Sequence, residues 1–121
     1  MSFLYSVTLD DPTEDGTFEW ISLPALNRYT GAGYLYWGKF PSLPQMGAAG
    51  IARSYVEWDI SSIPLDAIIT LVKFKYHGKT NDLSTDDGYI YAMAVRPSTG
   101  TDQDVYDDCA DGTAYYTDKV F

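Results

Sequence analysis

Alternating apolar and polar positions are clearest between Arg53 and Tyr76, where two runs flank a Ser-Ser-Ile-Pro corner. In the first run the expected core side is Val56, Trp58 and Ile60, and the expected solvent side is Tyr55, Glu57 and Asp59. In the second run Val72, Phe74 and Tyr76 alternate with Lys73 and Lys75. Because neighbouring side chains of a strand point to opposite faces, each run predicts a strand with one buried face. A short proline-containing connection is typical of an antiparallel sheet that covers a core.

The rest of the chain predicts further short strands, separated by turns rich in Asp, Pro and Gly. The expected strands are 3–9, 18–23, 34–40, 89–95 and 114–121. The expected loops are 10–16, 41–50, 78–88 and 102–112, with one helical turn around 105–109. No window of eleven residues has apolar positions at helical spacing, so we expect an all-β antiparallel sandwich.

Composition narrows the class of protein. The 121 residues suit a single domain, 1–121, with its own core. The net charge of −9 and the pI near 4.2 argue against a nucleic-acid-binding surface and against binding to anionic membranes, which both need basic patches. The chain has no apolar run long enough for a transmembrane helix, and its first residues lack the basic and apolar regions of a secretion signal.

Three spaced motifs carry a resemblance to a known family. They are LYWG at 35–38, RSYVEWDISSIP at 53–64, and DAIIT at 66–70 followed by an alternating run. Together they resemble the DNRLRE-type β-sandwich modules over roughly 34–95. The resemblance implies a jelly-roll fold, a place on the extracellular surface or in a virion, and carbohydrate binding in some members. Family domains generally run longer, so it also implies that the last strands are missing or are completed by a neighbouring chain.

A basic stripe is the first candidate site. Lys73, Lys75 and His77 lie at period-two spacing on one face of the expected second strand. They suit an acidic polysaccharide, but cross-strand ion pairs with Glu57 and Asp59 explain the same pattern. The tyrosines are the second candidate, since flat aromatic faces beside polar groups bind sugars. The expected sugar-facing tyrosines are Tyr34, Tyr36 and Tyr55.

Acidic residues cluster towards the C-terminus, and they fit either solvated loops or one Ca²⁺ site. The candidate calcium ligands are Asp102, Asp104, Asp107 and Asp108. Arg53 is expected to pair with a carboxylate across the sheet, and Cys109 to be a buried thiol or a cross-link to another chain. With one histidine and no phosphate-binding glycine loop, the sequence does not indicate an enzyme, and no cofactor beyond calcium is expected.

Two functions remain open. The first is a structural β-sandwich subunit that associates with copies of itself or with other assembly proteins. The residues expected to mediate self-association are Leu43, Met46, Val120 and Phe121. The second function is a carbohydrate-binding module. Of these two, the sequence favours the structural subunit, because of the apolar Pro/Gly loop at 41–50 and the strand-like ending at 114–121.

Overall fold

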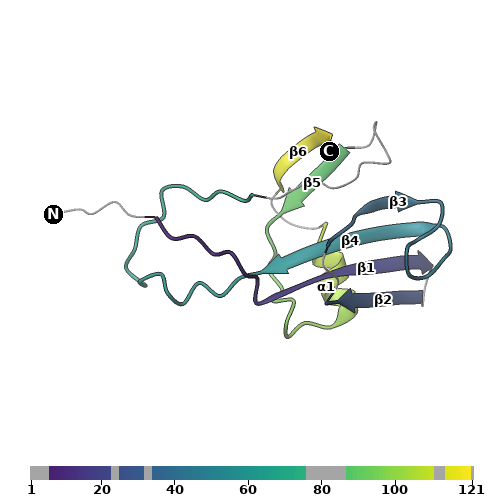
Figure 1. The fold of residues 1–121 in the computed structure, drawn as a ribbon, viewed down its shortest axis with the longest axis horizontal. Coiled ribbons are helices and arrows are strands. Elements are labelled where there is room, and N and C mark those ends of the chain that lie inside the picture. Colours follow the sequence, from purple (N-terminus) through teal and green to yellow (C-terminus); the bar gives the residue numbers. More distant parts are fainter. Residues whose placement is uncertain (1–5, 23–24, 32–33, 76–86, 111–113, 121) are drawn as a thin grey trace.

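The computed structural model describes residues 6–22, 25–31, 34–75, 87–110 and 114–120 (Figure 1). Its elements in chain order are β1 (Glu14–Ser22), β2 (Ala25–Thr30), β3 (Gly38–Phe40), β4 (Gly50–Glu57), β5 (Asp87–Tyr91), α1 (Asp102–Asp108) and β6 (Ala114–Val120). Strands β2, β1, β4 and β3 form a four-stranded antiparallel sheet in that order, and β5 pairs with β6. The described residues are therefore mostly β, and they form neither a closed barrel nor a second sheet stacked on the first.

Both faces of β1 are covered, and its residues 16–19 are all buried. Directly opposite residues of antiparallel strands share a face of the sheet. Phe18 is opposite Arg28 of β2 and Arg53 of β4, on the face that packs on α1. Glu19 belongs to the other face, where the loop between β3 and β4 contacts it. A strand covered on both sides loses the alternation of buried and exposed positions.

The core lies between the sheet and α1. Phe18 and Val105 have no exposed surface, and Tyr55 and Tyr106 are 3% and 6% exposed. The ring centroid of Phe18 lies 5.6 Å from that of Tyr55 and 6.0 Å from that of Tyr106, the latter in an edge-on arrangement. Gly16 lies beneath the Tyr55 side chain, where a Cβ atom would come within 2.6 Å of Tyr55 Oη. A side chain at this position would therefore displace Tyr55 from the core.

Two arginines fasten α1 and the segment before it to the sheet. Arg28 donates to the carbonyls of Pro97 and Gly100 at 2.8 and 3.2 Å, and its Nε lies 2.9 Å from Asp102 Oδ1. Its guanidinium also lies over the Phe18 ring, 4.9 Å from the centroid. Arg53 donates to the carbonyl of Tyr106 and lies 4.1 Å from the centroid of that ring. The expected partner of Arg53, a carboxylate across the sheet, is thus wrong among the described residues, because Arg53 faces α1.

Helix α1 begins where its sequence provides a cap. The Thr101 hydroxyl accepts a hydrogen bond from the Asp104 N–H at 3.3 Å, and the first turn is acidic, which suits the positive end of the helix dipole. Val105, Tyr106 and Asp108 form its buried side. The Asp108 carboxylate accepts from the Val95 N–H at 2.7 Å, so the helix is also tied to the segment after β5.

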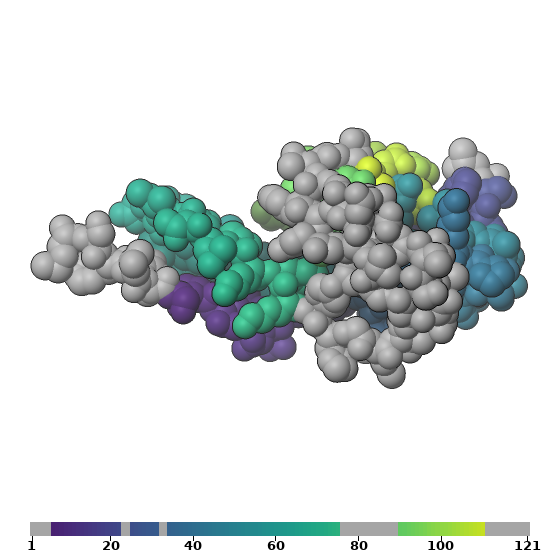
Figure 2. Space-filling view, turned by 90° about the horizontal axis from the view of Figure 1, so that it is seen from above, coloured from purple at the N-terminus to yellow at the C-terminus, as the bar shows by residue number. Residues whose placement is uncertain are grey.

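A long loop projects from the sheet beyond β4. Residues 58–75 leave at the end of β4 and return beside it, and residues 6–13 run alongside them (Figures 1 and 2). We call these two segments, 6–13 and 58–75, the wing. At its base the rings of Trp58 and Phe74 meet at 5.8 Å. Two turns bend the outgoing limb, with the Ile63 N–H donating to the Ile60 carbonyl and the Ala67 N–H to that of Pro64.

The structure confirms some predicted elements and corrects others. The strand at 18–23 corresponds to β1, the loop at 41–50 is confirmed up to Gly50, and β6 forms within 114–121. The strand expected at 89–95 overlaps β5. Strands β1 and β5 begin at Glu14 and Asp87, inside the expected loops 10–16 and 78–88, so these loops are shorter than predicted. The helical turn is confirmed, although α1 begins three residues earlier than the expected 105. Residues 6–9 and 72–75 are not strands, the strand at 34–40 is reduced to Gly38–Phe40, and β2 was not predicted. The expected jelly-roll sandwich is thus matched only as an antiparallel β structure.

The predicted orientation of the first run is wrong. Tyr55, expected in solvent, is 3% exposed, while Ile60, expected in the core, is 58% exposed. The reason is the pairing of Gly16 with Tyr55, which leaves room above Gly16 for the tyrosine ring on the α1 side. Phe74 and Val72 are 41% and 78% exposed, because the returning limb of the wing does not join the sheet.

Candidate functional site

Exposed apolar side chains concentrate on the wing. Leu65, Ile68 and Val72 are 107%, 88% and 78% exposed. The other exposed large apolar residues of the wing are Val7, Ile60, Ile69, Leu71 and Phe74. Among the residues whose side chains the structure describes, only Tyr34 and Trp37 share this property outside the wing. Soluble monomers rarely expose large contiguous apolar patches, and such patches mark contacts with other molecules.

The returning limb of the wing lies outside the two described sheets. Residues 68–73 take part in no strand pairing and in no loop backbone hydrogen bond with other described residues. Their sequence, Ile-Ile-Thr-Leu-Val-Lys, is rich in β-branched and apolar residues that favour strands. A segment of this composition is suited to pairing with another strand.

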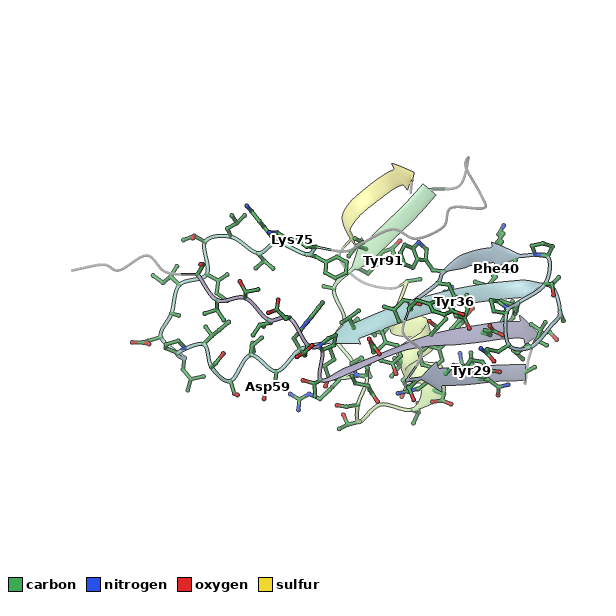
Figure 3. All side chains as sticks on the ribbon, viewed as in Figure 1. Tyr29, Tyr36, Phe40, Asp59, Lys75 and Tyr91 are labelled. Carbon is green, nitrogen blue, oxygen red and sulfur yellow. The ribbon has the colours of Figure 1, made fainter. Side chains whose placement is uncertain are left out.

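In the described part of the chain, Lys73 and Lys75 form no ion pair across the sheet. Glu57 accepts hydrogen bonds from Ser98, and Asp59 from the Ser61 N–H at 2.8 Å, which holds the pKa of Asp59 below its usual value. Lys75 and Asp59 lie on opposite limbs of the wing (Figure 3). The expected pairing of Lys73 and Lys75 with Glu57 and Asp59 is therefore wrong, because 72–75 is not a strand beside β4. His77 lies outside the described residues.

Aromatic side chains gather on the face of the sheet away from α1. The ring centroids of Tyr34 and Tyr36 are 6.0 Å apart. The ring centroid of Tyr36 is 5.9 Å from that of Phe40 (Figure 3). A shallow hollow here is lined by Tyr29, Tyr34, Tyr36, Asp15, Thr17 and Gln45, among others. The structure thus brings Tyr34 and Tyr36 together, but Tyr55 lies in the core on the opposite face and is unavailable to a ligand.

Glu19 is fully buried and fastens the loop between β3 and β4 to the sheet. Its carboxylate accepts from the Tyr36 hydroxyl at 2.6 Å and from the N–H groups of Gln45 and Met46 at 3.0 and 2.7 Å. Burial, and then this hydrogen bond to Glu19, raises the pKa of Tyr36. Alternation alone places Glu19 in solvent, so only the covering loop explains its burial. Its position holds Tyr36 at the hollow.

Replacing Glu19 with glutamine should lower the free energy of unfolding by about 1–3 kcal/mol, because an amide NH₂ would then face buried donors. Urea unfolding measures this change, and amide hydrogen exchange at Gln45 and Met46 should accelerate. Asp15→Asn, at a half-buried acid on the same strand face, is the matched control and should change stability by about 0.5 kcal/mol or less. Equal unfolding midpoints for Glu19→Gln and the wild type would contradict this role.

The candidate calcium ligands have separate partners. Asp102 lies against Arg28, Asp107 accepts from Gln103 at 2.9 Å, and Asp108 accepts from Val95. The expected loop is a helix, which spreads these carboxylates, and that of Asp104, around its axis. No group of three or more His, Cys, Asp or Glu side chains in the described part of the chain is arranged to hold a metal ion. The calcium site is not assembled there.

Cys109 is a partly exposed thiol packed against the core. Burial raises its pKa to about 11, from an ordinary value of 9.0. At pH 8 its thiolate fraction should therefore be roughly 100-fold lower in the folded protein than in urea. Alkylation by iodoacetamide should slow by about the same factor, and equal rates in both states would contradict it. Since the folded state holds this proton more tightly, Cys109 should favour folding up to about pH 9 and lose that contribution between about pH 9 and 11.

The residues expected to mediate self-association differ in their burial and in their place in the fold. Leu43 is 1% exposed, so its expected role in contacts between copies is wrong, because it fills the space beside Gly50. Met46 is half-buried in the loop that Glu19 holds. Val120 ends β6, whose partner strand is β5 of the same chain, and Phe121 lies outside the described residues. The exposed apolar surface is instead on the wing.

The described residues contain no helix long and apolar enough to cross a membrane. Comparisons of the chain with protein-family models, with curated proteins and with solved structures found no match.

Proposed function

We propose that this protein is a non-enzymatic structural subunit of a surface or virion assembly, which acts by associating with copies of itself through the wing. The observation that carries the proposal is the concentration of exposed apolar side chains on 6–13 and 58–75. Burial of each aliphatic side chain in a partner would contribute about 1.5–3 kcal/mol. In this proposal, the sandwich expected from the sequence is formed between copies, with a neighbouring chain supplying the facing strands.

Sedimentation velocity of the whole chain in buffer tests this function. The wild type should sediment as a dimer or larger species. The double variant Ile68→Glu, Val72→Glu should weaken association by roughly 100-fold or more, about 2.7 kcal/mol, because two charges would be buried at the interface. Tyr34→Glu places the same charge on an exposed residue outside the wing, and it should leave the oligomer unchanged. A monomeric wild type at high concentration would overturn the proposal.

A carbohydrate-binding module is the second candidate, and the tyrosine-lined hollow favours it. Tyr34 and Tyr36 adjoin polar Asp15, Thr17 and Gln45, a combination that suits the apolar and hydroxyl-bearing faces of a sugar. If the module binds glycans, a gel containing polysaccharide should retard the wild type but not Tyr34→Ala. Lys75→Glu should then abolish retardation by acidic polysaccharides alone. Absence of retardation by any polysaccharide would exclude this candidate.

A further inference from the structure

The tyrosine-lined hollow lies on the acidic face of the four-stranded sheet. Because opposite residues of paired strands share a face, the register of β1 to β4 assigns each charged side chain to one side. The basic residues Arg28, Lys39 and Arg53 all fall on the α1 side. The side of the hollow carries the carboxylates of Asp15 and Glu19, and no Lys, Arg or His is among the described residues that line it. This face therefore attracts cations and repels anions.

The tyrosine rings add to this preference. Tyr36 donates its hydroxyl proton to Glu19 at 2.6 Å, a short charge-assisted hydrogen bond that shifts electron density towards the ring. The Tyr34 ring adjoins that of Tyr36, with 43° between the two ring planes. The faces of aromatic rings carry negative partial charge, and they attract ammonium groups that lie within about 6 Å of the ring centroid.

Asp15 places a carboxylate beside the rings. Thr17 is directly opposite Tyr29 in the pairing of β1 with β2, and Asp15 comes two residues before Thr17 on the same face. Both described ion pairs are made by Arg28, so Asp15 takes part in neither. At Gly31, which lines the same hollow, an added Cβ atom would meet no described atom within 4 Å, so the hollow is open there. A half-buried carboxylate beside aromatic faces suits a ligand that is both apolar and positively charged.

We propose that the hollow binds the protonated amine of an amino sugar, with the ammonium group against Asp15 and the apolar C–H face of the sugar ring against Tyr34. The inference rests on the second candidate function, carbohydrate binding, and names the class of ligand. At the hollow it selects against acidic polysaccharides, since the carboxylates of Asp15 and Glu19 would repel their acid groups. A neutral sugar would gain the ring contacts alone.

Isothermal titration calorimetry of the whole chain with two tetrasaccharides tests this ligand class. One is β-1,4-linked glucosamine, and the other is its N-acetylated form, which has the same rings without the charges. At about pH 6, where most of the amines are protonated, the wild type should bind the glucosamine tetramer at least roughly 10-fold more tightly. Asp15→Asn should abolish that preference, and Tyr34→Ala should weaken the binding of both tetramers. Asp104→Asn removes the same charge from an exposed position on α1, across the sheet from the hollow, and this matched control should keep the preference.

The outcomes separate this inference from carbohydrate binding itself. Equal affinity for the two tetramers, or a preference that Asp15→Asn retains, overturns the amino sugar and leaves carbohydrate binding standing. Tetralysine carries ammonium groups without sugar rings, so if it binds as tightly as the glucosamine tetramer, the attraction is general to cations and the inference fails. Binding of neither tetramer also overturns it, and the polysaccharide gels then decide carbohydrate binding separately. Circular dichroism of each variant confirms that the sheet is intact.

Discussion

Replacing Phe18 with alanine should lower the free energy of unfolding by about 3–5 kcal/mol, the largest effect we expect from a single substitution. Phe18 has no exposed surface and contacts the rings of Tyr55 and Tyr106 as well as the guanidinium of Arg28. The vacancy would sit between the sheet and α1, where neither layer can close without breaking the contacts of Arg28. Since whole domains are stable by only about 5–15 kcal/mol, the variant should be close to unfolding at 37 °C.

Urea unfolding followed by circular dichroism measures this loss. Phe18→Leu keeps most of the volume and should cost about 1.5 kcal/mol or less. Tyr34→Ala removes a similar ring from a residue that is 54% exposed, and it should cost under about 1 kcal/mol. A loss at Phe18→Ala no larger than at Tyr34→Ala would contradict the core described here.

Replacing Arg28 with alanine should cost about 3 kcal/mol or more. The change removes charged donors from the carbonyls of Pro97 and Gly100, leaves Asp102 without its cation, and uncovers the Phe18 ring. Arg28→Lys should recover only part of this loss, because a single ammonium cannot reproduce the forked contacts of the guanidinium. Thermal or urea unfolding reports both changes.

The exposed Arg96 provides the matched control for Arg28. Arg96→Ala should alter the free energy of unfolding by about 0.5 kcal/mol or less. Amide exchange in α1 gives a second readout, since loss of Arg28 should release the helix while leaving the pairing of β1 with β4 protected. An Arg28→Ala protein as stable as Arg96→Ala would show that the arginine is dispensable.

The sequence allowed the antiparallel β class to be predicted, but not the way the sheet is covered. An alternating pattern assumes that a strand buries one face, whereas β1 is packed on both sides. The pattern therefore did not predict the burial of Glu19. The same assumption turned Tyr55 outward, because an apolar Val56 seemed the better core residue. What decides the orientation is the space above Gly16, a contact between residues 39 positions apart that local patterning does not encode.

The wing shows a different limit of sequence reasoning. Residues 66–75 have the composition of a strand, and residues 72–75 also alternate, which the sequence alone indicates. Whether a strand forms depends on a partner with free backbone groups, and the four-stranded sheet does not supply one there. Strand β2 was missed for the converse reason: Asn27 and Arg28 interrupt its apolar pattern, yet pairing with β1 and the contacts of Arg28 hold it in place. The sequence thus predicted a strand within 66–75, but not that this segment would be exposed.

In the proposed assembly, the resistance of each chain to proteolysis depends on whether its wing is covered by other copies. A solitary copy leaves residues 68–75 exposed and outside any helix or strand, and proteases cleave exposed irregular segments most readily. In an assembled copy, the neighbouring chains would cover the same peptide bonds. The melting temperature would then rise with total protein concentration. Surplus subunits would then be removed by degradation, while incorporated ones persist.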